Sequence, residues 1–327
     1  MELASYLHHG SGDLLEERSD VQRLIQEDAL AAWCARWLGA QPTRVLFEVA
    51  HLSRVTGLQL ADGREVVIKA RPPAERIQAC VHVQRHLWAA GFPCPEPLAG
   101  PHPLGTLTAT AETFVPGGTQ LEPGADSPQL FAEALAALVH LAPPVTAIPT
   151  LAPPPAWVFW DHDQPGTWPL PDDRDDDLNR YPEPAWLEAV GRRVRHRLAQ
   201  CRQSPVVGHA DWEEPNLRWI DRHLYVVHDW DSVVSRPEAA LAGVAAAVCP
   251  AFGGPGTATL EESEAFLRAY EQVRGQPWSV DERQVCWAAG LWIRAYNAKK
   301  ATLEGDGEAL LARLDGEAAE PLRLAGA

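Results

Sequence analysis

One stretch limits the possible folds of this chain more than any other feature: residues 206–233, VVGHADWEEPNLRWIDRHLYVVHDWDSV. An apolar approach leads to Asp211, and Asn216 follows five residues later. A predicted hairpin then turns near residues 221–222 and leads into the β run LYVVH, which ends next to Asp229. Because this hairpin spans only about a dozen residues, we expect it to return Asp229 to the side of Asp211 and Asn216.

These three side chains form the set that phosphoryl transfer needs. A carboxylate has to accept the proton of the attacking hydroxyl, or orient that hydroxyl, while an Asn oxygen and a second carboxylate hold Mg²⁺ against nucleotide phosphates. The protein-kinase signature H-R-D-L-x-x-x-N, followed by an Asp-led metal motif, has the same layout. Singly, the three residues would fit a cap, a turn and a surface position. Jointly, they predict Asp211 as the base or orienting carboxylate, and Asn216 and Asp229 as Mg²⁺ ligands.

A lysine for the phosphates is expected upstream of this stretch. Residues 65–69, EVVIK, form a predicted β-strand that ends in Lys69, similar to the V-A-I-K element whose amine pairs with the α and β phosphates. The chain has three lysines, of which the others are Lys299 and Lys300, against 25 arginines. In a chain with so many arginines, a cation on the surface would most often be arginine. The presence of a lysine at the end of this strand therefore indicates a specific role, in which its compact charge binds phosphates.

The remaining pattern predicts two lobes, a β-containing portion followed by a mainly helical one. We expect strands within 44–70 and 105–115, with a turn at 61–64, and helices at 22–39, 74–90, 129–142 and 184–200, with three or four more in 239–327. Nine prolines from residue 143 to residue 171 predict an irregular insertion that is packed by Trp157, Trp160 and Trp168. The acidic run at 172–177 is typical of a solvated loop, with a rim for a cationic substrate as the alternative.

Five segments together resemble the aminoglycoside phosphotransferase and choline kinase-like family, whose members have the protein-kinase fold and phosphorylate small-molecule hydroxyls. Residues 209–216 (HADWEEPN) resemble the catalytic loop HGDxxxxN, and residues 228–231 (HDWD) resemble the IDW-type metal motif. Residues 90–98 (AGFPCPEPL) resemble GxPVPxPL, residues 112–118 (ETFVPGG) the hinge, and residues 138–141 (LVHL) the LxxLH helix end. The order and spacing of the five segments are more specific than any one of them.

The resemblance implies a bilobal, protein-kinase-like α+β fold, with a β-sheet nucleotide-binding lobe at 1–118 and a helical lobe with catalytic loop and substrate pocket at 119–327. It also implies transfer of the γ-phosphoryl of ATP or GTP, with Mg²⁺ bound and Asp211 as the base. The carbonyl of Thr113 and the N–H of Val115 are then expected to meet the adenine or guanine edge. His209 is expected to support the loop through hydrogen bonds.

The chain departs from the family pattern around the phosphates. Its phosphate loop would be residues 49–54, VAHLSR, which contain no glycine, and we expect Ser53 to be the donor there. Glu75 is the candidate partner of Lys69, although a glutamate in the first helical turn also fits a role in complementing the helix dipole. Gln84 lies nearer the middle of the same predicted helix but carries no charge.

Charge restricts the partners of the chain. The net charge of −16 argues against a general nucleic-acid or anionic-membrane binder, because neutralising phosphates needs a dense cationic surface. We expect an aminoglycoside-like antibiotic, as in antibiotic resistance, or another amine-bearing acceptor, because Glu213, Glu214, Asp231 and the 172–177 run could surround it with negative potential. A macrolide, a homoserine or a sugar is compatible with the same motifs.

A second hypothesis comes from another functional class. A catalytically silent pseudokinase that binds a nucleotide or another ligand would fit the atypical phosphate loop and the undetermined partner of Lys69. A protein kinase is disfavoured, because no DFG-to-APE activation segment follows Asp229.

The cellular compartment is predicted from the cysteines and the N-terminus. The six cysteines are scattered without a CxxC pair, which indicates reduced thiols. The first 20 residues lack the cationic and apolar regions of a signal peptide, and no run of about 20 apolar residues occurs. We therefore expect a soluble cytoplasmic protein, with the oligomeric state and the choice between ATP and GTP left open.

Overall fold

The structure, a computed structural model, describes residues 27–50, 52–248, 257–304 and 307–327. The chain divides into two compact units, one within Met1–Ala74 and Pro97–Phe114, the other comprising Glu75–Glu96 and Val115–Ala327. Residues 75–96 thus group with the second unit, and the lobe boundary that we expect at residue 118 stays a prediction. The expected absence of a signal peptide, and residues 22–26 of the first expected helix, lie outside the described residues.

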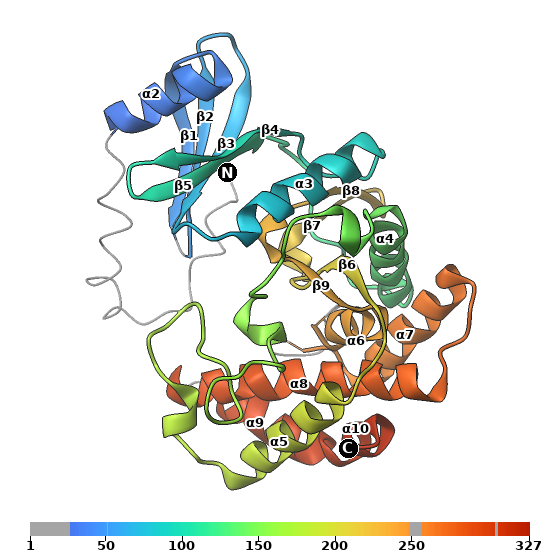
Figure 1. Cartoon of the computed structure of the whole chain (residues 1–327). Coiled ribbons are helices and arrows are strands. Elements are labelled where there is room, and N and C mark those ends of the chain that lie inside the picture. The colour runs from blue at the N-terminus through green and yellow to red at the C-terminus, as the bar shows by residue number, and fades with distance from the viewer. Residues whose placement is uncertain (1–26, 51, 249–256, 305–306) are drawn as a thin grey trace. The chain divides into compact units, whose positions relative to one another are not determined.

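The first unit is built on a five-stranded antiparallel sheet with the strand order β1-β2-β3-β5-β4 (Figure 1). Four of its strands confirm the predicted β segments: β1 (Pro42–Ala50), β2 (Arg54–Leu60), β3 (Glu65–Arg71) and β5 (Leu107–Thr113). The fifth, β4 (Pro97–Leu104), was not predicted because it contains three prolines. It lies at the sheet edge, where the missing N–H of proline costs no ladder hydrogen bond.

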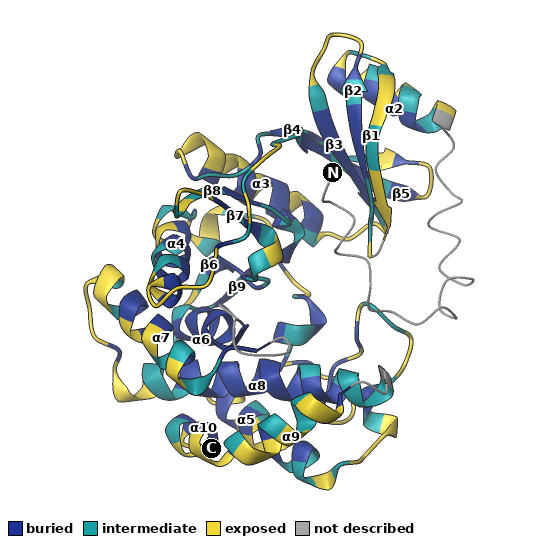
Figure 2. Ribbon diagram, turned by 180° about the vertical axis from the view of Figure 1, so that it is seen from behind, coloured by how far each residue is buried: buried dark blue, intermediate teal, exposed yellow. Residues whose placement is uncertain are grey.

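A helix packs on this sheet. Helix α2 (Glu27–Leu38) ends before Gly39, whose φ of 74° favours glycine, as the sequence predicts. The helix buries Trp33 and Cys34 in one hydrophobic core with sheet residues that include Leu58 and Ile68. Figure 2 shows that β3 is buried except at its two ends, and Lys69 in this strand is only 8% exposed.

The second unit is mainly helical, which with the antiparallel sheet of the first unit confirms the predicted α+β class. Its helices are α3 (Arg76–Ala89), α4 (Ser127–Leu141), α5 (Ala185–Ala199), α6 (Glu238–Val248), α7 (Leu260–Arg274), α8 (Val280–Glu304), α9 (Glu308–Glu317) and α10 (Ala319–Ala325). Five helices of the described chain therefore follow residue 237, rather than three or four, because α9 and α10 are separate short elements. None of the described helices combines the length and apolar composition that a membrane span requires.

The proline-rich insertion is irregular, as predicted, with 3-10 turns η2 (Val145–Ala147) and η3 (Ala156–Val158) and then η4 (Leu178–Arg180). Trp160 and Trp168 are buried in the core of the second unit, and Trp157 is partly buried against it. The expectation of a solvated loop at 172–177 is wrong for Asp173, which forms an ion pair with Lys300 on α8. A half-buried carboxylate stays charged when a cation lies close to it, as Lys300 does here. The sequence pattern around Asp173 does not indicate Lys300 as its partner.

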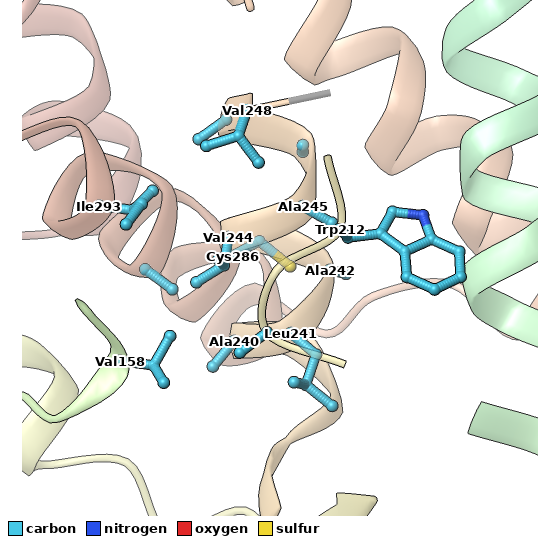
Figure 3. Packing of buried hydrophobic residues seen from close by; sticks show 14 of the residues in the cluster. Val158, Trp212, Ala240, Leu241, Ala242, Val244, Ala245, Val248, Cys286 and Ile293 are labelled. Carbon is cyan, nitrogen blue, oxygen red and sulfur yellow. The ribbon is translucent and has the colours of Figure 1, made fainter. Parts of the chain in front are cut away.

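Helices α6 and α8 form the densest crossing in the second unit. Figure 3 shows Val244 of α6 beside Cys286 of α8. The helices meet at Gly243, where an added Cβ would lie 2.0 Å from the carbonyl oxygen of Cys286. The small residues of α6 therefore allow the two backbones to approach closely, and a backbone oxygen is an atom that cannot move aside alone.

Replacing Gly243 by alanine should destabilise the protein by about 1–3 kcal/mol, because the new methyl group forces α6 and α8 apart. Gly316 on α9 is the matched control, since nothing lies within 4 Å of its added Cβ. Gly316→Ala should raise the free energy of unfolding by roughly 0.5–1 kcal/mol through the entropy of the unfolded chain. Denaturant unfolding measures both variants, and equal free energies of unfolding would contradict the packing described for this crossing.

Candidate active site

Two short antiparallel ladders hold the segment at 206–233. β6 (Pro205–His209) pairs with β9 (Val233–Pro237), and β7 (Leu217–Ile220) pairs with β8 (His223–Val227). Between β7 and β8, Asp221 and Arg222 have φ values of 46° and 62°, the geometry of a tight two-residue hairpin turn. The predicted hairpin is confirmed, and β9 adds a partner strand that was not predicted.

The ladder register brings the two halves of this segment together. Because His209 pairs with Val233, the residues that follow β6 lie beside those that precede β9. The N–H of Ala210 donates to the carbonyl of Ser232 at 2.8 Å, and the N–H of His228 donates to the carbonyl of Asn216 at 2.8 Å. The loop with Asp211 and the segment with Asp229 are therefore neighbours.

The side chain of Asn216 faces Asp211. Its Nδ2 donates to Asp211 Oδ2 at 2.7 Å and to the main-chain carbonyl of Asp211 at 3.0 Å. Because both partners are acceptors, the amide nitrogen has to face them, and Oδ1 is the atom of Asn216 that can coordinate a cation. The 3-10 turn η5 (Glu214–Asn216) gives the chain the bend that folds Asn216 back toward Asp211.

Asp229 adopts a left-handed conformation, with φ 60° and ψ 54°, which Asp tolerates better than most residues. It precedes the 3-10 turn η6 (Trp230–Ser232), and Ser232 Oγ donates to Asp229 Oδ2 at 3.0 Å. Together with the Asn216 oxygen, this carboxylate supplies hard oxygen donors of the kind that Mg²⁺ takes alongside substrate phosphates. The residues present therefore fit a divalent cation bound together with a nucleotide.

His209 is buried between the two segments. Its Nε2 donates to the carbonyls of Asp229 at 2.9 Å and His228 at 3.2 Å, which requires the proton on Nε2. Its Nδ1 accepts from the N–H of Asp211 at 3.2 Å. Burial lowers the pKa of His209, so the neutral ring ties the backbones of Asp211 and Asp229 together.

The local electrostatics disfavour negative charge in this segment. Burial, followed by the charges of Glu213 and Asp229, raises the pKa of Asp211 well above its usual range, while the hydrogen bond from Asn216 opposes the shift. Burial and the neighbouring Glu214 also raise the pKa of Glu213, against the opposing charge of Lys300. A cation bound here would therefore relieve repulsion among carboxylates.

The predicted nucleotide-binding residues of the first unit lie on its sheet or in the connection from β1 to β2. Lys69 is in β3, and its Nζ lies 3.5 Å from Glu112 Oε1 on β5. Thr113 ends β5, where it pairs with Val66. Ser53 lies half-buried in the connection from β1 to β2; within the expected phosphate loop, residue 51 lies outside the described residues.

The other predicted site residues belong to the second unit. Glu75 precedes α3, is exposed and makes no side-chain hydrogen bond that caps the helix. Val115 lies two residues after the end of β5, and Asp231 lies in η6 two residues after Asp229. Glu214 begins η5, and burial with the charge of Glu262 on α7 raises its pKa.

Sequence reasoning missed two residues that hold this segment in place. Ser232 supports the Asp229 carboxylate, and its position three residues after that aspartate is the only signal in the sequence. Arg76 at the start of α3 donates to the carbonyls of Asp231 and Val233, each at 2.6 Å. No local pattern marks Arg76, because its partners are backbone atoms about 155 residues further along the chain.

Three solved structures share this fold. The amicoumacin kinase hAmiN, in complex with AMP-PNP, Ca2+ and Ami, is 15% identical, with 91% of this chain and 95% of that chain covered at a TM-score of 0.60. A thermostable mutant of the aminoglycoside phosphotransferase APH(4)-Ia, in its apo form, is 17% identical, with 88% and 97% covered at 0.54. The spectinomycin phosphotransferase APH(9)-Ia, in complex with ADP and spectinomycin, is 14% identical, with 92% and 94% covered at 0.54. These similarities confirm the predicted protein-kinase-like fold.

The family follows from a sequence comparison. A search of curated proteins finds no match. The model of the phosphotransferase enzyme family, APH, matches residues 52–282, which is more than half of the chain. All five segments that carry the resemblance lie within this range. The chain therefore belongs to the phosphotransferase enzyme family, and it is an enzyme that transfers a phosphoryl group to a hydroxyl.

Proposed function

We propose that the protein transfers the γ-phosphoryl of ATP or GTP to a hydroxyl of a small molecule, with Asp211 as the catalytic base. The observation that carries this proposal is the connected geometry of Asp211, Asn216 and Asp229, which hydrogen bonds through His209 and Asn216 hold together. In this role Asp211 orients the acceptor hydroxyl and accepts its proton.

The remaining roles concern the nucleotide. Asn216 Oδ1 and the Asp229 carboxylate would hold Mg²⁺, which neutralises charge on the phosphates when it is bound. Lys69 would bind the α and β phosphates, with Ser53 as a further donor. The carbonyl of Thr113 and the N–H of Val115 would bind the base edge. Positioning and charge neutralisation supply most of the rate in such a site.

The acceptor is, in this proposal, an aminoglycoside-like or other amine-bearing molecule. Glu213 lies two residues after Asp211, and burial, followed by the charge of Glu214, raises its pKa, so the ionised carboxylate would gain from a nearby positive charge. An ammonium group of the acceptor would supply that charge, with Glu214 and Asp231 as further candidates for contact. The free thiols of the described cysteines fit a cytoplasmic reaction, where nucleotides are available.

Release of ADP or GDP with Mg²⁺ tests the proposal, using a panel of aminoglycosides, simple amines, macrolides, homoserine and sugars as acceptors. We expect release to rise well above the rate without acceptor for at least one amine-bearing compound. Thermal shift with each nucleotide reports binding independently of turnover, because a ligand that binds the folded state raises its melting temperature. Nucleotide binding without acceptor-dependent release would favour the pseudokinase instead.

A further inference from the structure

A buried ion pair in the first unit involves the predicted phosphate-binding lysine. Lys69 Nζ lies 3.5 Å from Glu112 Oε1, and the two residues are 8% and 7% exposed. Removing charges from water is costly, and this cost is offset only when the two groups meet at close range. The two side chains therefore restrain each other.

The sheet register explains why these two residues meet. Lys69 pairs with Thr110, and Val67 pairs with Glu112, across the antiparallel β3 and β5. Residues two apart on a strand point to the same face, so Lys69 and Glu112 are diagonal neighbours on one face of the sheet. Both strands are held on each side by other strands, because β3 lies between β2 and β5, and β5 lies between β3 and β4. The pair is thus built on a rigid part of the sheet.

Helix α3, in or next to which a glutamate partner of Lys69 was expected, contains no glutamate. Helix α3, RIQACVHVQRHLWA, contains no acidic residue, and Glu75 stands before its first residue in an exposed position. Gln84, the mid-helix alternative, donates through Nε2 to the carbonyl of Pro95 at 3.0 Å. This bond uses the amide nitrogen of Gln84, and the amide has no negative charge to pair with the ammonium of Lys69.

We propose that Glu112, rather than a glutamate of the α3 region, is the positioning residue that holds the ammonium of Lys69 for the nucleotide phosphates. The inference rests on the proposed role of Lys69 in phosphate binding. Glu112 directly precedes Thr113, the expected contact of the base edge. One strand end would thus position the nucleotide at two points, through the backbone of Thr113 and through the carboxylate of Glu112.

Lysine NMR tests the pairing without relying on activity. The chain has three lysines, so protein labelled with ¹³C at lysine Cε gives three signals, and Lys69→Met identifies the one from Lys69. Glu112→Gln should lower the pKa of Lys69 by at least about 1 unit, because an opposite charge favours the charged ammonium. Glu65→Gln is the matched control at the start of β3, whose partner Arg44 lies 3.9 Å away on the exposed surface. It should leave the Lys69 signal unchanged.

Affinity for Mg·AMP-PNP, measured by calorimetry, tests the positioning role. Glu112→Gln should weaken binding by at least about 10-fold, as should Lys69→Met, and the double variant should be no weaker than Lys69→Met alone. Glu75→Gln should change neither the affinity nor the Lys69 pKa. If Glu112→Gln does not fold, Glu112→Asp replaces it, because aspartate keeps the negative charge on a shorter side chain. We expect the Lys69 pKa and the affinity for Mg·AMP-PNP in Glu112→Asp to lie between those of the parent protein and those expected for Glu112→Gln.

These measurements distinguish the pairing of Lys69 with Glu112 from the proposed binding of phosphates by Lys69. An unchanged Lys69 pKa in Glu112→Gln, or the same shift in Glu75→Gln, overturns the pairing. A lowered pKa with unchanged affinity in both Glu112→Gln and Lys69→Met supports the pairing but overturns the phosphate role of Lys69. Loss of affinity in Lys69→Met alone supports the proposed function and overturns the positioning role of Glu112.

Discussion

Replacing Asp211 by asparagine should lower kcat by about 10²- to 10⁴-fold, which is the usual contribution of a positioned base. Asn216 Nδ2, which donates to Asp211 Oδ2 at 2.7 Å, can donate to the amide oxygen of the new side chain, so the loop geometry should persist. We therefore expect the KM for nucleotide to change little. Nucleoside diphosphate release with the best acceptor of the panel measures both constants.

The same variant should be more stable than the parent protein when no Mg²⁺ is present. A raised pKa means that the ionised Asp211 is less favourable in the folded chain than in the unfolded chain. This destabilisation is complete above the folded-state pKa and disappears as the pH falls below the unfolded-state value. Asp211→Asn should therefore raise the free energy of unfolding at neutral pH, and the gain should vanish in acid.

Asp221→Asn is the matched control for the expected loss of kcat and gain in stability of Asp211→Asn. Asp221 lies in the turn between β7 and β8, ten residues after Asp211, is exposed, and has a positive φ that asparagine also tolerates. It should leave kcat unchanged. Equal activity of Asp211→Asn and Asp221→Asn would remove Asp211 from the reaction.

Replacing Asp229 by asparagine should lower kcat/KM by roughly 10³-fold at low Mg²⁺, since a metal that neutralises phosphate charge is worth about 4 kcal/mol of the barrier. Asparagine tolerates the left-handed conformation of Asp229 and can still accept from Ser232 Oγ, so the backbone should be retained. The Mg²⁺ concentration for half-maximal rate should rise strongly. Titration of the rate with Mg²⁺ at fixed nucleotide measures this change.

Ser232→Ala tests the support of Asp229, the proposed metal ligand. Loss of the Oγ hydrogen bond should weaken the apparent Mg²⁺ affinity by about 10- to 100-fold while leaving the rate at saturating Mg²⁺ nearly unchanged. A normal Mg²⁺ titration in Asp229→Asn would exclude Asp229 as a ligand.

Local patterns predicted the elements that depend on neighbours in sequence. The hairpin of β7 and β8 follows from its strand pattern and turn, and helices α4 and α5 follow from apolar spacing. Strand β9 was missed because its pairing with β6 joins residues that are 24 to 32 positions apart. Strand β4 was missed because prolines fit only the edge of a sheet, and edge positions are a property of the assembled sheet.

In the candidate site, too, contacts between residues close in sequence were predicted and contacts between distant residues were not. The spacing of Asp211, Asn216 and Asp229 predicted that one segment brings them together, since each contact lies within the segment at 206–233. The pairing of Lys69 with Glu112 depends on the register of β3 and β5, which are separated by more than 30 residues. Likewise, Asp173 and Lys300 meet across 127 residues, and neither sequence neighbourhood identifies the other.

A crystal structure with Mg²⁺ and AMP-PNP tests the central claim most directly, namely that Lys69, Asp211, Asn216 and Asp229 serve one nucleotide. We predict Mg²⁺ at about 2.1 Å from Asn216 Oδ1 and from a carboxylate oxygen of Asp229. We also predict Lys69 Nζ within hydrogen-bond reach of the α or β phosphate, and the Asp211 carboxylate facing the γ-phosphate. Phosphates or metal bound away from these residues, or Lys69 turned away from the phosphates, would contradict the account.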